Sequence, residues 1–134
     1  MSTPTSKTLA LLRSQGYYPW VVERFIPPMS KRDLFHIIDI VCCIPTGILG
    51  VQSCGTAFAP HVQKLMEDEA WHTRHWLNSG GRELVLIGWR KLKQKRGGKR
   101  MIFKPRIAFI TMKQGVLSCQ EVKYIWLRQR KKAS

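Results

Sequence analysis

The sequence predicts an α/β fold in which a mixed central sheet is flanked by helices. Apolar, β-branched stretches bounded by turn residues lie on both sides of one long segment with helical periodicity, which is the main basis for this prediction. A chain of 134 residues has the length of one domain and buries about two-thirds of its unfolded surface. Neither an internal repeat nor a linker divides it, so we expect a single domain over residues 1–134.

The first half of the chain predicts one helix and three strands. A helix is expected over residues 6–15, with Ser6 as its N-cap and Gly16 just past its end. The aromatic and β-branched segment 18–26 predicts a strand that two prolines close, and residues 29–33 predict a loop. Segments 34–43 and 47–54 then predict two strands around a Pro-Thr-Gly turn.

The second half predicts a long helix followed by two strands. Helical periodicity extends from about residue 60 to 78, with an apolar stripe formed by Val62, Leu65, Met66, Ala70, Trp71 and Leu77. Strands are expected over 82–93 and 101–111, and Pro105 makes the second an edge strand. A last helix is expected from about Ser118, before a basic tail at about 128–134.

The charge balance predicts a polyanionic partner. The chain has 23 Lys and Arg against 8 Asp and Glu, a formal net charge of +15. Phosphates attract such a chain because counterion release favours binding, so nucleic acid is the leading partner. A merely basic soluble surface and an anionic membrane surface are the alternatives. No apolar run reaches the roughly 20 residues of a membrane span, and we expect an intracellular protein without a signal peptide.

A basic hairpin is expected over about residues 84–111. No acidic residue occurs between Arg90 and Lys113, and the turn reads KRGGKR. Crowded like charges favour a bound polyanion, so we expect this ribbon to contact the DNA backbone. The candidate contact residues are Arg90, Lys91, Lys93, Lys95, Arg96, Lys99 and Arg100.

The cysteines and histidines do not predict a zinc site. Cys42 and Cys43 are adjacent and point to opposite faces of a strand, so we expect free thiols rather than disulfides. His72 and His75 stand on a helix without the cysteine spacing of structural zinc sites, and phosphate contact is the favoured interpretation.

A hard-cation site is expected where the two central strands pair. Asp39 interrupts an apolar strand and Gln52 ends the next one, although neither residue type suits a core. Paired through the turn, their side-chain oxygens would lie about 4 to 5 Å apart. Mg²⁺ takes oxygen ligands and needs only one or two from protein where phosphate supplies others.

The segments VVERF, KRDLFHIIDIV and ILGVQSCG resemble the PD-(D/E)XK nuclease superfamily, which includes Holliday-junction resolvases and restriction enzymes. Within it they are most similar to small phage and prophage proteins with Gln where most members have an acid. The resemblance covers about residues 6–90. It implies a restriction-endonuclease-like α-β-β-β-α-β core, a phage- or prophage-encoded cytoplasmic protein, and a Mg²⁺ or Mn²⁺ cofactor.

The resemblance also implies roles for particular residues. Asp39 matches the metal-binding Asp, Gln52 matches the second acid, and Glu23 would supply a third metal oxygen. Val51 would add its carbonyl where strand geometry allows. The motif lysine should fall at Cys54 and is absent there. Lys64 is the preferred replacement, Lys31 and His61 are the other candidates, and Asp33 is an alternative to Asp39.

Structural interpretations stand beside these roles. Asp39 could pair with Arg24 or Arg32, Gln52 could bond a neighbouring backbone group, and Lys64 could belong to a solvated helix face. Glu23 could equally be solvated, and Asp33 could cap the next strand.

Three functions follow from the sequence. The first is a metal-dependent DNA endonuclease, for duplex or branched DNA, which by analogy with junction resolvases acts as a homodimer. The second is a noncatalytic nuclease-fold module that binds nucleic acid. The third is a basic adaptor for an acidic protein partner.

Overall fold

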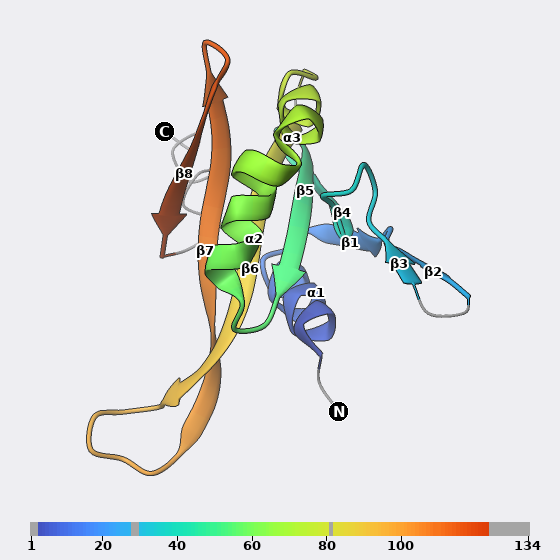
Figure 1. Ribbon diagram of the computed structural model, residues 1–134. Helices are drawn as coiled ribbons and strands as arrows, with labels where there is room; N and C mark the ends of the chain where they lie inside the picture. Colours follow the sequence, from blue (N-terminus) through green and yellow to red (C-terminus); the bar gives the residue numbers. More distant parts are fainter. Residues whose placement is uncertain (1–2, 28–29, 81, 124–134) are drawn as a thin grey trace.

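The computed structural model describes residues 3–27, 30–80 and 82–123 (Figure 1). Its elements in chain order are α1 (Pro4–Ser14), β1 (Tyr18–Val21), β2 (Arg24–Ile26), β3 (Ser30–Arg32), β4 (Ile40–Ile44), β5 (Gly47–Cys54), α2 (Phe58–Gln63), the π-helical turn η1 (Lys64–Asp68), α3 (Ala70–Leu77), β6 (Arg82–Lys93), β7 (Met101–Lys113) and β8 (Val116–Val122). The predicted α/β class with a mixed, helix-flanked sheet is confirmed.

Six strands form the central sheet in the order β1-β4-β5-β6-β7-β8. Only β5 and β6 pair in parallel, and the α2–η1–α3 segment connects them, as a parallel pair requires. The other neighbours are antiparallel. The predicted hairpin of β6 and β7 is confirmed, and its tip projects beyond the rest of the sheet (Figure 1).

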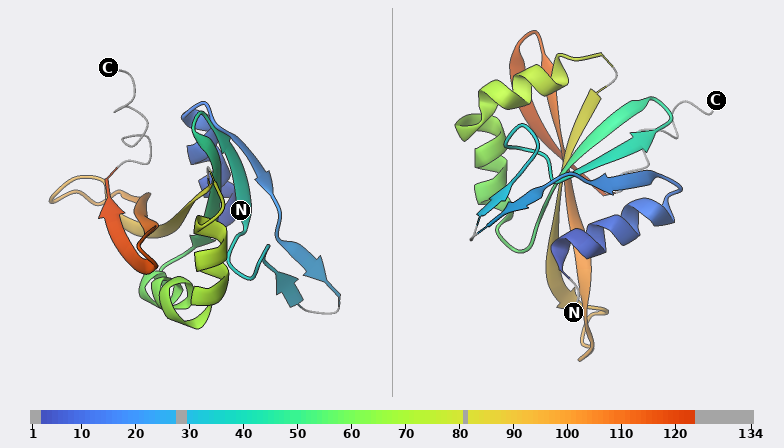
Figure 2. Two further views of the ribbon diagram at one scale, coloured as in Figure 1. Left: turned by 90° about the horizontal axis from the view of Figure 1, so that it is seen from above. Right: turned by 90° about the vertical axis from the view of Figure 1, so that its right-hand side faces the viewer.

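The helices cover opposite faces of this sheet (Figure 2). On one face α1 packs Leu12 against a cluster that includes Val51 and Ile87. On the other face α2–η1–α3 contributes Phe58, Leu65 and Trp76 to a second cluster. Because alternate strand residues face alternate sides, Gln52 and Cys54 point toward α2 while Val51 points toward α1.

The amino-terminal helix starts earlier than the sequence analysis predicts. Its N-cap is Thr3, not Ser6. The Thr3 hydroxyl accepts the Ser6 N–H at 3.1 Å, and the Ser6 hydroxyl accepts the Thr3 N–H at 2.9 Å. This reciprocal capping, with Pro4 at the first turn, satisfies donors that Ser6 alone would leave open. Gly16 follows the helix with φ +80°, as expected.

The strand predicted over 18–26 is two strands. The strand is interrupted at Val22 and Glu23. The N–H groups of these two residues both donate to the carbonyl oxygen of Asp39, at 2.9 and 3.2 Å. Beyond the break, β2 pairs with β3 in a separate two-stranded sheet. The loop predicted at 29–33 is therefore wrong for Ser30–Arg32, because strand pairing with β2 overrides its polar composition.

The strand predicted over 34–43 begins only at Ile40. Leu34 and Ile38 instead close a tight turn, in which Phe35 and His36 have φ values of 53° and 65°. Left-handed backbone is unfavourable for such side chains. Burial of Ile37 and Ile38, both 0% exposed, holds the turn against that cost.

The predicted long helix is interrupted by the π-helical turn η1. The predicted apolar stripe holds in part, because Val62, Leu65, Met66 and Leu77 all belong to or pack against the second cluster. Trp71, predicted to be in the core, is 67% exposed, and Trp76 is buried at 4%. Thr73 is also buried and donates its hydroxyl to the Leu65 carbonyl at 2.8 Å.

Two predictions for the carboxyl-terminal part are corrected. β7 lies between β6 and β8 and is not an edge strand; over the described residues β8 pairs with Ile107–Lys113 of β7, a stretch that does not include Pro105. The helix expected from Ser118 is wrong over the described residues, where β8 runs to Val122. The basic tail at 128–134 lies outside the described residues.

No helix among the described residues is long and apolar enough to cross a membrane.

Gly50 allows the buried turn and α3 to approach β5. A Cβ there would lie 2.8 Å from Ile38 Cδ1 and 2.9 Å from Trp76 Cζ2. We expect Gly50→Ala to lower the free energy of unfolding by about 1–3 kcal/mol, because both neighbours are buried and overpacking forces them to move. Urea denaturation measures this. Gly80→Ala is the matched control, because nothing lies within 4 Å of its added Cβ. Equal stability of the two variants would contradict the packing of α3 on β5.

Candidate functional site

The site is built around the buried carboxyl group of Asp39, at the start of β4. Asp39 is 4% exposed and Gln52, on the neighbouring β5, is 2% exposed. Asp39 Oδ2 accepts the Gln52 Nε2–H at 2.6 Å and the Ser53 backbone N–H at 2.9 Å. The predicted proximity of Asp39 and Gln52 therefore holds, although Asp39 precedes the strand instead of lying within it. The pairing with Arg24 or Arg32 considered above is replaced by these partners.

Two further carboxylates approach Asp39. Glu23 follows the break after β1, and Asp33 precedes the tight turn. One oxygen from each of Glu23, Asp33 and Asp39 lies within 4.8 Å of the others, a grouping that could hold a metal ion. Asp33 and Asp39, treated as alternatives from the sequence, thus belong to one cluster. Asp33 and Asp39 flank one tight turn, and the tertiary fold adds Glu23 from a separate segment.

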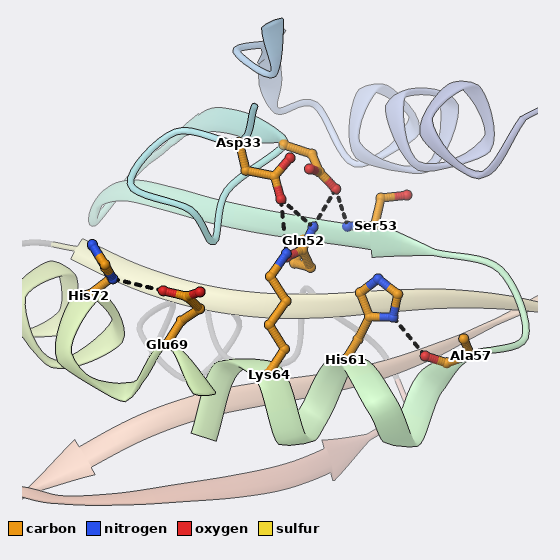
Figure 3. Close-up of polar contacts among 9 residues, drawn as sticks. Asp33, Gln52, Ser53, Ala57, His61, Lys64, Glu69 and His72 are labelled. Atoms are coloured by element: carbon orange, nitrogen blue, oxygen red, sulfur yellow. Dashed lines mark hydrogen bonds and ion pairs between the residues drawn. The ribbon is translucent and has the colours of Figure 1, made fainter. Parts of the chain in front are cut away.

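Lys64 extends from η1 into this cluster (Figure 3). Its Nζ donates to Gln52 Oε1 at 3.0 Å and to Asp33 Oδ2 at 3.1 Å. The Lys64 side chain is 30% exposed and that of Asp33 is 16% exposed. The ammonium group is therefore at the site that the sequence analysis assigned to it, partly shielded from water. Its hydrogen bonds show that it is not simply part of a solvated helix face.

Burial and the neighbouring acid separate the pKa values of the two inner carboxyls. Desolvation raises the pKa of Asp39 to about 8, and its hydrogen bond with Asp33 adds to this increase. The pKa of Asp33 is lowered: burial opposes the change, but the hydrogen bonds from Asp39 and Lys64 and the Lys64 charge outweigh it. Near neutral pH the pair therefore retains a proton on Asp39, while Asp33 is ionised beside Lys64.

Gln52 has its amide group oriented by both neighbours. Its NH₂ faces Asp39 and lies 3.4 Å from Asp33 Oδ2, while its carbonyl oxygen faces Lys64. To ligate a cation together with Asp39, as the sequence analysis expects, the amide would have to turn over. The Val51 carbonyl already accepts the Asp39 N–H at 2.9 Å, so its second lone pair is what remains for another contact.

The structure describes two of the other residues considered at the expected lysine position. Cys54, where the resemblance would place the motif lysine, is buried and has a thiol pKa that burial raises to about 11. It is therefore protonated at neutral pH. His61 Nδ1 lies 2.7 Å from the Ala57 carbonyl, within its own helix. The side chain of Lys31 lies outside the described part of the structure.

The histidine pair on α3 is not part of a metal-binding group among the described residues. His72 Nδ1 lies 3.0 Å from Glu69 Oε1, and the His75 ring lies tilted against Trp71 with ring centroids 4.2 Å apart. All four cysteines are free, as predicted; Cys42 and Cys54 are buried, whereas Cys43 and Cys119 are exposed.

The basic hairpin presents its charges to solvent. The seven candidate contact residues, Arg90, Lys91, Lys93, Lys95, Arg96, Lys99 and Arg100, are all exposed. Trp89 belongs to the core, where its Nε1–H donates to the Thr8 hydroxyl at 2.8 Å. Phe103 is 48% exposed and lies under the Lys7 ammonium group, 4.0 Å from its ring centroid.

Ser53 is the site group that sequence reasoning missed. Its contribution is a backbone N–H, which carries no residue-type signal. The only available signal was its place directly after Gln52 on a strand that ends beside an acid.

Comparisons with protein-family models, with curated proteins and with solved structures find no match to this chain.

The raised pKa of Asp39 predicts a pH-dependent stability. The folded state binds this proton more tightly than the unfolded state, in which the pKa of Asp39 is near 3.8. The stability that this proton contributes is therefore complete below pH 3.8 and is lost as the pH rises toward 8. In metal-free buffer we expect the stability of Asp39→Asn relative to wild type to increase between pH 5 and pH 9, by on the order of 2 to 4 kcal/mol. Urea denaturation at both pH values measures this.

Asp68→Asn is the control for this experiment, because Asp68 is an exposed acid on η1. Parallel pH profiles for wild type and Asp39→Asn would show that Asp39 is ionised throughout.

Proposed function

We propose that the protein is a metal-dependent DNA endonuclease with a PD-(D/E)XK-like site. The observation that carries this proposal is the convergence of Glu23, Asp33 and Asp39 within 4.8 Å, with Lys64 Nζ bonded to Asp33 at the same point. A stable core has no use for three acids in one place, because desolvation and mutual repulsion destabilise them. Their retention supports a catalytic role.

The donor set fits a hard divalent cation such as Mg²⁺ or Mn²⁺. It offers carboxylate oxygens and one amide, and no soft ligand besides a protonated buried thiol nearby. Burial is the main cause of the raised pKa of Asp39, and the neighbouring Asp33 adds to it. Glu23, Asp33 and Asp39 would hold the ion, with Gln52 joining after its amide turns. When bound, such an ion supplies Lewis-acid stabilisation of charge on a phosphate oxygen.

Lys64 and Asp39 have separate roles in this proposal. Lys64 is held by Asp33 and Gln52, so its remaining N–H positions a water molecule against the scissile phosphate and stabilises charge that develops there. Asp39 releases its proton when positive charge enters the site, which links activity to pH. The Ser53 N–H then stabilises the carboxylate that remains.

The hairpin supports DNA as the substrate. Its exposed basic residues lie along β6, β7 and the projecting tip, and no acidic residue occurs between Arg90 and Lys113 (Figure 1). A two-stranded basic ribbon suits backbone contacts that position DNA without reading its sequence. Branched DNA and a homodimer remain part of the proposal by analogy with junction resolvases.

A second function, DNA binding without cleavage, is favoured by one observation. Lys64, Gln52 and Asp33 already satisfy one another, and Cys54 replaces the motif lysine. A polar network whose side chains already form hydrogen bonds with one another binds a cation less readily.

Cleavage separates the two functions. We expect Mg²⁺- or Mn²⁺-dependent nicking of DNA that Asp39→Asn lowers at least about 100-fold, because it removes a ligand of the ion. Lys64→Met should lower nicking about 10- to 100-fold, because it removes the group that stabilises charge on the phosphate. Asp68→Asn should retain wild-type activity. The substrates are branched, duplex and single-stranded DNA, compared at protein concentrations that give equal binding. Binding by all variants with no cleavage by wild type would instead establish the noncatalytic module.

Salt dependence tests the hairpin. We expect replacement of Arg96 and Lys99 by alanine to flatten the slope of log Kobs against log salt by about 2, since each phosphate contact contributes about 0.9. Arg13 and Lys123 are exposed basic residues outside the hairpin, and they provide a charge-matched control pair. Equal slopes for the two double variants would show that the hairpin does not contact DNA.

A further inference from the structure

We propose that an aromatic pocket beside the acid cluster binds an unpaired nucleobase of the DNA, so that the substrate class is DNA with unpaired nucleotides near the cut. Because DNA is taken as the ligand, the role of this pocket rests on the proposed function. None of the roles assigned above uses the pocket.

The pocket lies between the tight turn after Asp33 and α3, and has a volume of about 320 Å³. That volume is at the lower end of the range for small-molecule sites. Its walls are formed mainly by Phe35, Trp71, His72, His75, Trp76 and Arg82.

Exposed aromatic rings make the pocket a stacking surface. Trp71 is 67% exposed and Phe35 is 53% exposed, so both rings present apolar surface to solvent at the pocket. Trp71 lies against His75 in a tilted arrangement, with ring centroids 4.2 Å apart, and Phe35 lies 6.2 Å from Trp76 between ring centroids. Stacking on aromatic rings accepts any base, because every base has a π face.

The charge of the rim selects a nucleotide over an apolar peptide. Arg82 lies over the Trp76 ring, 4.8 Å from its centroid, and the wall residues include no acid. His75 also lines a second hollow of about 290 Å³, which Arg74 borders. Single-stranded DNA, in which the bases can stack and the phosphates carry negative charge, matches this combination of aromatic and cationic groups. Glu69 contacts a wall residue from outside the pocket, where its Oε1 lies 3.0 Å from His72 Nδ1.

The pocket and the acid cluster are built from the same two segments. The turn carries Asp33 in the cluster and Phe35 in the pocket, and the helical segment carries Lys64 in the cluster and His72 in the pocket (Figure 3). Phe35 and His36 keep left-handed backbone, which is strained for their side chains. That strain directs Phe35 outward beside the acids. A base held here therefore belongs to a nucleotide close to the phosphate at the cluster.

The test determines whether one aromatic side chain of the protein contacts one base of the DNA. Binding of a short single-stranded oligonucleotide is measured by fluorescence anisotropy in EDTA, with an abasic site placed at each position in turn. The proteins are wild type, Trp71→Ala, Trp71→Phe and the control Trp20→Ala, whose ring is 65% exposed on β1. A fully paired duplex with the same number of phosphates serves as the second ligand.

We expect Trp71→Ala to weaken binding of the intact oligonucleotide about 5- to 100-fold, and Trp71→Phe and Trp20→Ala to weaken it much less. One abasic position should reproduce the loss in wild type and add nothing to the loss in Trp71→Ala. Duplex affinity should stay unchanged. Phe35→Ala, checked like Trp71→Ala for a native melting curve, provides a second test of the same pocket.

Equal losses for intact and abasic oligonucleotides, or for duplex and single strand, would overturn the proposal. So would unchanged DNA affinity with an altered oligomeric state, which would assign the rings to a second copy of the chain. Because binding is measured without metal, a protein that couples Trp71 to one base but cleaves nothing would keep the pocket and lose the nuclease. Cleavage without coupling of Trp71 to one base would keep the nuclease and reject the role of the pocket.

Discussion

The burial of Asp39 is the constraint on which the arrangement of the site depends. Its backbone carbonyl accepts the N–H groups of Val22 and Glu23, and its own N–H donates to Val51. Its carboxyl group accepts hydrogen bonds from Gln52 and Ser53. One residue therefore joins the break after β1 to the start of β4 and the end of β5. A buried carboxyl needs such partners, and satisfying them also positions Glu23 beside it.

The π-helical turn η1 is the second determinant of the site. It widens the helix at Lys64–Asp68, immediately where Lys64 must extend toward Gln52 and Asp33. On α3, which follows this turn, Trp76 is buried and Trp71 is exposed. The Thr73 hydroxyl donates to the Leu65 carbonyl and so ties α3 to η1. This one helical segment therefore carries the lysine of the acid cluster and, further along, the exposed ring of the neighbouring pocket.

Sequence reasoning succeeded where pattern and tertiary structure agree. β5 and β6 follow from uninterrupted apolar runs, and the proximity of Asp39 and Gln52 follows from pairing through a short turn. It failed at the turn that holds Phe35 and His36, because no propensity favours left-handed backbone for these residues. It failed again at Trp71, a large apolar ring that a regular 3.6-residue period from Leu65 already places off the apolar stripe, and at β8, where pairing with β7 decides the structure. The first of these failures borders the acid cluster, because Asp33 and Asp39 flank that turn.

The balance of charge at the cluster bears on how a cation would be held there. Near neutral pH, Glu23 and Asp33 supply negative charge, Asp39 retains its proton, and Lys64 offsets one carboxylate. Gln52 adds no charge where an acid would add one. Under the proposed function, the protein alone therefore attracts a divalent cation less strongly than three free carboxylates would. A DNA phosphate brought by the basic hairpin supplies both the missing charge and further oxygen ligands. Cation binding and substrate binding would then be coupled, which confines the chemistry to the complex with DNA.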